Sequence, residues 1–256
     1  MIKFFRKIRY KLMSENKNTK YFKYAIGEIV LVVIGILIAL QINNWNVARV
    51  ETNQEIKILK ELKNDLNTNL AEITEMITDI SNRKKAANLI LSYIKEQKKV
   101  NDTLKLAFEL LPLDGIFNNA QTAYKYIENQ GINIISNDSL RIRITVMYEK
   151  DFLNITNREN MEKQIILTEF TPILSPLLIT TTSIWKNPNP DTNEDIFPTI
   201  PNKPINMKAF KDNKVINAIV HLRNWISLRG LRLKETQTKL QLLIKATQEE
   251  IKKLES

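Results

Sequence analysis

The chain has 256 residues, enough for one medium domain or two small ones, and 26% of its residues are charged. Five glycines and no cysteine disfavour tight β-hairpins and exclude disulfides, thiolate nucleophiles and cysteine-ligated metal sites. A net charge of +10 is compatible with nucleic-acid binding, but residues 1–44 hold eight Lys/Arg against two Glu, whereas the rest holds 30 basic and 26 acidic residues. Because the excess lies beside an apolar segment, we expect contact with a membrane and none with nucleic acid.

Residues 1–24 are predicted to form a basic, amphipathic tail in the cytoplasm. In the first thirteen residues, MIKFFRKIRYKLM, apolar and basic side chains fall on opposite sides of a helix. Such a helix can lie on an anionic inner leaflet, although a basic tail that only sets the orientation of the chain explains the same residues. The residues expected at the two membrane interfaces are Lys3, Arg6, Lys7, Tyr21, Tyr24 and Trp45.

Residues 25–42 are predicted to cross the membrane as one helix. Ile29 to Leu40 has no polar side chain, and a helix of 18 residues is about 27 Å long, close to the hydrocarbon thickness. A buried helix of a soluble protein does not explain the basic and aromatic flanks. A cleaved signal peptide would need a small-x-small site after Leu40, where the sequence reads QINNWNVARV. The segment is therefore interpreted as an uncleaved signal anchor.

One face of this helix carries Glu28, Gly35 and Ala39, which are seven and four residues apart. Gly35 and Ala39 form a small-xxx-small pair, which allows the close approach of another helix. This face is interpreted as a packing face for self-association or for a partner helix. The alternative, that Glu28 extends to the headgroups and the small residues are incidental, is equally compatible with the sequence.

Residues 43–256 are predicted to form an extracytoplasmic helical domain. A heptad pattern indicates a helix from about Asn46 to Gln97, which could continue directly from the membrane helix. A second helix is predicted from about Met207 to Leu254, and antiparallel packing would bury both apolar stripes. The first seam of the N-terminal heptad holds Leu59, Leu66, Ile73, Ile80, Ala87 and Ile94; the second holds Ile56, Leu70, Ile77 and Leu91, with breaks at Lys63 and Lys84. The C-terminal stripe consists of Val215, Ile219, Leu222, Ile226, Leu233, Leu240, Leu243 and Leu254.

A structural corner is predicted between two shorter helices. The first runs from Asn118 to Gln130 and ends at Gly131, and the second runs from Asn137 to about Phe170. The predicted N-cap of the second helix is Ser136, and its hydrophobic staple is Ile135 with Leu140. These residues are expected to fix the angle between the helices rather than to bind a ligand.

Residues 171–206 are predicted to be a long proline-rich loop, because they hold seven of the eight prolines. Loops of this length are usually functional or disordered. If the four helical stretches run up and down from the membrane, the loop lies at the distal end, where Trp185 and Phe197 would contact a partner. A connector without a function of its own is an equally good interpretation.

The sequence contains no pattern typical of a catalytic, cofactor-binding or metal site. No two glycines are closer than eight residues, so a phosphate-binding loop is absent. His221 is the only histidine, which excludes a histidine pair and the Glu-x-x-His motifs of metal bundles. We therefore expect no enzymatic activity and no cofactor.

Two blocks of the sequence are distinctive. The first is KYFKYAIGEIVLVVIGILIALQINNWN, from Lys20 to Asn46, and the second is AYKYIENQGINIISNDSLRIRITVMYE, from Ala123 to Glu149. Both resemble a family of uncharacterised single-pass membrane proteins from flavobacteria and their relatives, and in the first block the polar residues match as well as the apolar run. The resemblance implies a bacterial inner membrane with the C-terminal domain in the periplasm. It implies no activity, cofactor or catalytic residue.

The sequence thus predicts an all-α protein: one transmembrane helix followed by an elongated antiparallel bundle of about four helical stretches. The expected function is that of a scaffold or adaptor that contacts an envelope protein or a second copy of itself. The alternative is a ligand-sensing bundle that signals through a partner protein.

Overall fold

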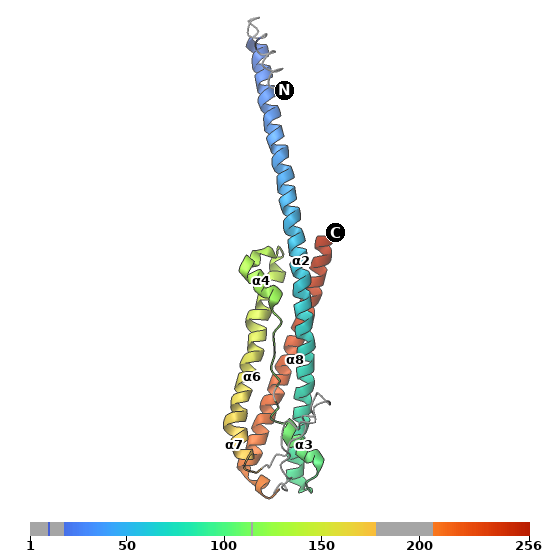
Figure 1. Cartoon of the computed structure of the whole chain (residues 1–256), viewed down its shortest axis with the longest axis vertical. Helices are drawn as coiled ribbons and strands as arrows, with labels where there is room; N and C mark the ends of the chain where they lie inside the picture. Colours follow the sequence, from blue (N-terminus) through green and yellow to red (C-terminus); the bar gives the residue numbers. More distant parts are fainter. Residues whose placement is uncertain (1–9, 11–17, 114, 178–206) are drawn as a thin grey trace, which may run out of the picture. The chain divides into compact units, whose positions relative to one another are not determined.

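The computed structural model describes residues 10, 18–113, 115–177 and 207–256, and these residues are all-α, with no strand among them. The chain divides into two compact units, Met1–Lys57 and Ile58–Ser256. Helix α2, Asn18–Glu96, contributes to both units (Figure 1). The predicted interface residues Lys3, Arg6 and Lys7 and the predicted partner contacts Trp185 and Phe197 lie outside the described residues.

The first unit is described through the N-terminal part of α2. This part contains a candidate membrane span that begins at Ala25, and its most apolar window is not buried by any other segment. Leu31 is 61% exposed and Leu37 is 58% exposed. Gly35 and Ala39 are exposed too, and apart from the local helix backbone nothing lies within 4 Å of the position that a Cβ of Gly35 would take. At Gly35 and Ala39 the face predicted for helix packing is therefore open.

The second unit contains three long helical runs: α2 from Ile58 onward, the run α5 to α7, and α8. The bounds of the remaining elements are α3 Asp102–Leu110, α4 Thr122–Gln130, η1 Ile132–Ile134, α5 Asp138–Val146, η2 Met147–Phe152, α6 Leu153–Ile165, η3 Ile166–Phe170, α7 Thr171–Leu174, η4 Ala209–Lys211 and α8 Asn213–Glu255. Their order agrees with the predicted helices, but α3 was not predicted.

Side-chain contacts fix the directions of the long helices. Helices α2 and α8 are antiparallel: Lys60 of α2 pairs with Glu255 of α8, and Ile80, further along α2, lies close to Gly230, which is earlier in α8. The run α5 to α7 is also antiparallel to α8. Its pairs with α8 are Asn137–Glu250, Asp151–Lys239, Glu162–Arg229 and Glu169–His221. As a result, α2 and the run α5 to α7 are parallel to each other.

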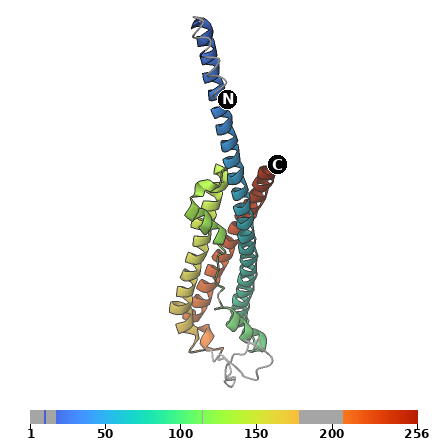
Figure 2. The ribbon, with the colours of Figure 1, turned by 45° about the horizontal axis from the view of Figure 1, so that its top comes forward.

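The chain returns between these two parallel runs mainly through residues 111–121, of which the described ones contain no helix. This segment passes along the long helices from α3 to α4 (Figures 1 and 2). The chain therefore alternates in direction as the up-and-down order requires, but this leg is not helical, in contrast to the four helical stretches considered from the sequence. Extended and turn conformations are favoured here by Pro112, Gly115 and the pair Asn118–Asn119. Helix α4 accordingly begins at Thr122 rather than at the predicted Asn118.

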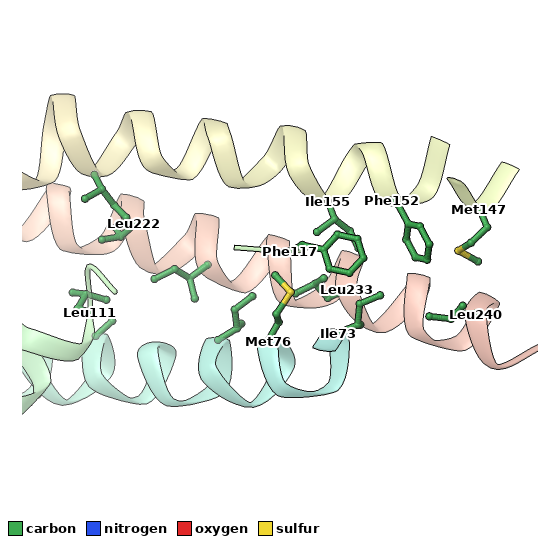
Figure 3. Close-up of a cluster of buried hydrophobic side chains, with 14 of the residues drawn as sticks. Ile73, Met76, Leu111, Phe117, Met147, Phe152, Ile155, Leu222, Leu233 and Leu240 are labelled. Atoms are coloured by element: carbon green, nitrogen blue, oxygen red, sulfur yellow. The ribbon is translucent and has the colours of Figure 1, made fainter. Parts of the chain in front are cut away.

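The first heptad seam of α2 is confirmed, since all six of its residues are buried. The second predicted seam is displaced by one residue: its apolar members are only half-buried, and Lys84 is exposed. The buried positions in the second unit are instead Leu62, Asn69, Met76, Arg83 and Ile90. Two of these five residues are polar, so a search for apolar residues selected the neighbouring positions. Figure 3 shows Ile73 and Met76 of α2 facing Leu233 of α8 and Phe117 of the return segment.

Two π-helical segments, η2 and η3, interrupt the run α5 to α7. Buried residues near these segments are spaced four apart: Ile144 lies in α5, and Tyr148 and Phe152 lie in η2. A spacing of four drifts around an α-helix of 3.6 residues per turn, and the wider π turn corrects this drift. In η3 the N–H of Thr171 donates to Ile166, which opens the turn just before Pro172. The helix consequently continues through Leu174, beyond the predicted start of the loop at residue 171.

The residues of the predicted corner lie at the junction of α4 and α5. Gly131 ends α4 with φ +94°, a conformation that favours glycine, and Ile135 and Leu140 are buried. The predicted N-cap Ser136 is wrong, because Asn137 caps α5 by accepting from the N–H of Leu140 at 3.1 Å. This shift also removes Ile135 and Leu140 from the positions of a hydrophobic staple.

The start of the last helix differs as well, since α8 begins at Asn213 rather than Met207. Asp212 is its N-cap and accepts from the N–H of Lys214 at 2.8 Å. Phe210, in the short helix η4 before this cap, is fully buried and lies 5.0 Å from the ring of Phe108 on α3. This aromatic contact holds the segment before α8 against the bundle.

Candidate functional site

Four charged residues meet in the interior of the second unit: Arg83 of α2, Glu159 and Glu162 of α6, and Arg229 of α8. Each is at most 6% exposed. Arg229 donates to both Glu159 and Glu162 at 2.9 Å, and Arg83 donates to the other oxygen of Glu162. Two positive and two negative charges thus compensate each other where water is excluded, a condition under which buried charges are tolerated. We call these four residues the buried charge network.

The network also binds the backbone of the return segment. Arg83 donates to the carbonyl of Leu111 at 3.1 Å, and Arg229 donates to the carbonyl of Gly115 at 3.1 Å. The N–H of Phe117 donates to both oxygens of Glu159, at 3.1 and 3.3 Å. A backbone that passes between helices without its own helical bonds needs such partners. The network is therefore a structural device that allows a non-helical segment inside the bundle.

Polar side chains of α2 continue this pattern toward α4. The fully buried Asn69 accepts from the N–H of Ala120 at 2.7 Å and donates to the carbonyl of Ala120 at 2.8 Å. Glu72 accepts from the N–H of Asn118, and Asp65 accepts from the N–H of Ala123 in the first turn of α4. Asp65 thereby takes over the capping of a helix whose own N-cap, Gln121, makes no side-chain cap bond.

Two tyrosines close the same end of the core. The rings of Tyr124 and Tyr148 are stacked with centroids 4.3 Å apart, and the hydroxyl of Tyr148 donates to the carbonyl of Ala120 at 3.3 Å. Burial, followed by a hydrogen bond to Glu149, raises the pKa of Tyr124 to about 12. Burial, followed by the charge of Asp65, raises the pKa of Tyr148 well above its ordinary value. Both phenols therefore stay protonated at neutral pH, and neither can serve as a base there.

A cleft of about 270 Å³ lies beside the buried charge network, between η2 and α6 on one side and α8 on the other. We call it the basic cleft, because five of its lining residues are cationic and two are anionic. Its lining consists of Lys150, Asp151, Asn154, Ile155, Arg158, Arg229, Arg232, Leu233, Glu235, Thr236 and Lys239. The π-helix η2 supplies Lys150 and Asp151, and irregularities of this kind are frequent at functional sites.

The described residues contain no group of three His, Cys, Asp or Glu side chains placed to hold a metal ion. His221 is half-exposed on α8, and its Nδ1 lies 2.7 Å from a carboxylate oxygen of Glu169. Among the other predicted residues, the structure brings Gly131, Ile135 and Leu140 together at the corner, and Glu28, Gly35 and Ala39 lie along α2.

The buried charge network and the basic cleft were not predicted from the sequence, yet a signal for them exists. The apolar stripe of α8 has gaps where an apolar residue is due, at Arg229, Thr236 and Thr247. All three are buried. A polar residue at a stripe position must find a buried partner, so these gaps mark the polar contacts of the core.

The described residues thus define an all-α protein with a candidate membrane span and a helical bundle whose apolar core contains the buried charge network. The chain belongs to a family of unknown function, DUF6090, which matches residues 28–172. This range begins in the candidate span and ends in α7, so it includes Arg83, Glu159 and Glu162. No curated protein and no solved structure matches the chain.

Proposed function

We propose that the chain is a membrane-anchored helical adaptor that acts through protein–protein contacts and not through catalysis. Its N-terminus would lie in the cytoplasm and its bundle in the periplasm of a bacterium with an inner membrane, as in the flavobacterial proteins that it resembles. The observation that carries the proposal is the unburied apolar surface of the candidate span. Exposing about twenty apolar residues to water has a high free energy, and burying them in the hydrocarbon of a membrane lowers it.

The bundle offers surfaces for a partner. Its core is filled by apolar side chains and the buried charge network, but several large apolar residues on the run α5 to α7 face outward. Ile142 is 62% exposed, Leu153 is 53% exposed and Met161 is 54% exposed. In the first unit, the open face with Gly35 and Ala39 is suited to a second membrane helix.

Site-specific photo-crosslinking of the full chain in native membranes tests this function. We expect probes at Leu153 and Met161 to give discrete crosslinked products, and probes at Ala39 to show whether the membrane helix packs against another copy. Probes at Trp185 and Phe197 test the predicted role of the proline-rich loop. The matched control is a probe at Lys234, an exposed polar position of α8. If no position gives more product than Lys234, the adaptor function is wrong.

A second candidate function is ligand sensing, which the basic cleft favours. Helix α2 belongs to both units, so it is the element through which an occupied cleft would affect a partner in the membrane. The test is the crosslinking pattern with and without ligand. A sensor changes its products when the cleft is filled, whereas an adaptor gives the same products in both states.

A further inference from the structure

The basic cleft contains cations that no acidic residue in the described part of the chain neutralises. The side chains of Lys150 and Arg158 form no ion pair or hydrogen bond among the described residues, although both line the cleft. Arg158 is half-buried, which limits its access to water. Two unneutralised charges in one cleft repel each other, and an anion between them relieves this repulsion.

Two further cations of the cleft, Arg232 and Lys239, form ion pairs that differ in burial. Arg232 pairs with Glu235 at 2.8 Å, but both side chains are about half exposed, and surface pairs of this kind contribute little. Lys239 pairs at 2.7 Å with Asp151, whose side chain is 8% exposed. An incoming anion can therefore replace Glu235 at Arg232, whereas Lys239 remains bound to Asp151.

The fifth cation, Arg229, is already held by Glu159 and Glu162 of the buried charge network. It fixes the inner wall of the cleft and keeps α6 and α8 together there. Asn154 and Thr236 add uncharged polar groups to the lining. The cleft is thus a fixed cavity with three available cations, from Lys150, Arg158 and Arg232.

We infer that the basic cleft binds a small, multiply charged oxyanion, such as a phosphate ester or a polycarboxylate, between Lys150 and Arg158 of one wall and Arg232 of the other. Guanidinium groups match phosphate and carboxylate oxygens with two parallel hydrogen bonds, which explains why two arginines are present. The volume lies just below the range of about 300–1,000 Å³ of drug-sized pockets, so the ligand is small. This inference deepens the ligand-sensing function, but binding itself requires no signal.

Isothermal titration of the full chain in nanodiscs of zwitterionic lipid tests the inference, with pyrophosphate and citrate as probes. We expect saturable binding of at least one probe with a dissociation constant below about 1 mM. Arg158→Gln and Lys150→Gln should each weaken binding about tenfold or more, because each removes a charge-assisted bond. The dissociation constant of Arg158→Lys should lie between those of Arg158→Gln and the natural protein, because lysine keeps the charge but cannot donate two parallel hydrogen bonds.

Lys163→Gln and Lys234→Gln are the matched controls, because they remove the same charge from exposed positions of α6 and α8 outside the cleft. Asn154→Asp adds a negative charge at an exposed lining position and should abolish binding without disturbing the core. Thermal unfolding monitored by circular dichroism verifies that each variant is folded.

Three results would overturn the inference: no saturable heat for either probe, equal weakening by the cleft and control variants, or a pyrophosphate response that disappears in nanodiscs with phosphatidic acid. The last result would assign the site to lipid headgroups rather than to a free anion. None of these results affects the adaptor function, which depends on the crosslinked products. Conversely, binding of pyrophosphate with unchanged crosslinking would leave this inference standing and remove the sensing function.

Discussion

Glu162 is a buried carboxylate that connects three long helices. It is fully buried, and its two oxygens accept from Arg83 of α2 and from Arg229 of α8. Replacing a buried ion pair with apolar residues is often neutral, so the network is weak evidence for stability as such. Removing one member is different, because it leaves a buried charge without compensation. The three long helices therefore depend on this carboxylate for their mutual positions.

We expect Glu162→Gln to lower the free energy of unfolding by about 3–5 kcal/mol, since two buried guanidinium groups would then share one remaining carboxylate. The measurement is urea unfolding of the full chain in detergent micelles. Glu75→Gln is the control, because it makes the same change at an exposed position of α2, and its expected effect is within about 0.5 kcal/mol. A Glu162→Gln effect as small as that of the control would show that the network does not hold the helices.

Glu250 connects the corner to the last helix and makes stability depend on pH. Burial raises the pKa of Glu250, but hydrogen bonds from Lys253 and Asn137 outweigh burial and hold this pKa below its ordinary value. A carboxyl whose pKa is lower in the folded than in the unfolded state stabilises the protein above its unfolded pKa, and this stabilisation is lost as the pH falls through the folded pKa. Asn137 also caps α5, so one residue serves both contacts.

We therefore expect the difference in unfolding free energy between the natural protein and Glu250→Gln to be largest above the ordinary pKa of a glutamate and to shrink as the pH falls below it. Urea unfolding at several pH values measures this difference. Glu249→Gln removes an exposed neighbouring carboxylate and should change stability by less than about 0.5 kcal/mol. A Glu250→Gln difference that is independent of pH would contradict the proposed coupling.

At the scale of the helices, the sequence predicts what apolar periodicity determines and misses what polar contacts determine. The first seam of α2 was predicted correctly, and so was the stripe of α8 except Leu254, which is only half-buried. The second seam was missed because Asn69 and Arg83 occupy core positions that apolar patterns skip. Their partners are backbone groups of the return segment, 51 and 28 residues away. No local pattern reports such contacts, so neither the return segment nor the basic cleft could be predicted.

Helices α2 and α8 also approach each other closely at Gly230. A Cβ on this residue would lie 2.7 Å from Cγ2 of Ile80, a branched side chain with little freedom to move. Gly230→Ala gains about 1 kcal/mol of helix propensity but costs about 1–3 kcal/mol through overpacking. We expect a net loss of up to about 2 kcal/mol, measured by urea unfolding.

The background Ile80→Ala supplies the control for this prediction. Without Cγ2 of Ile80 the clash is absent, so Gly230→Ala should stabilise that variant by up to about 1 kcal/mol. The double-mutant cycle measures the coupling between the two positions directly. Equal effects of Gly230→Ala in both backgrounds would show that the two helices do not need glycine at this point.

At the scale of the whole chain, two kinds of apolar surface coexist. In the second unit apolar residues are buried among α2, α8 and the run α5 to α7, whereas in the first unit they are exposed along α2. Composition alone predicts this division, because the exposed stretch lacks the polar face that the bundle helices possess. The ligand or partner cannot be predicted in the same way, because binding depends on surfaces that form only in the folded bundle.

The proposed membrane insertion of the exposed stretch can be tested with two charges. Val33→Arg and Leu37→Arg lie one turn apart near the middle of the predicted span, and each arginine costs about 2.5–3.5 kcal/mol at the centre of a membrane helix. We expect the double variant to be extracted from membranes by alkaline carbonate, whereas the natural protein stays in the pellet. Val47→Arg with Val50→Arg adds the same charges to exposed positions of α2 beyond the predicted span and should leave the protein in the pellet. If the double variant in the span also resists extraction, the stretch is not held in hydrocarbon, and the anchored adaptor must be abandoned.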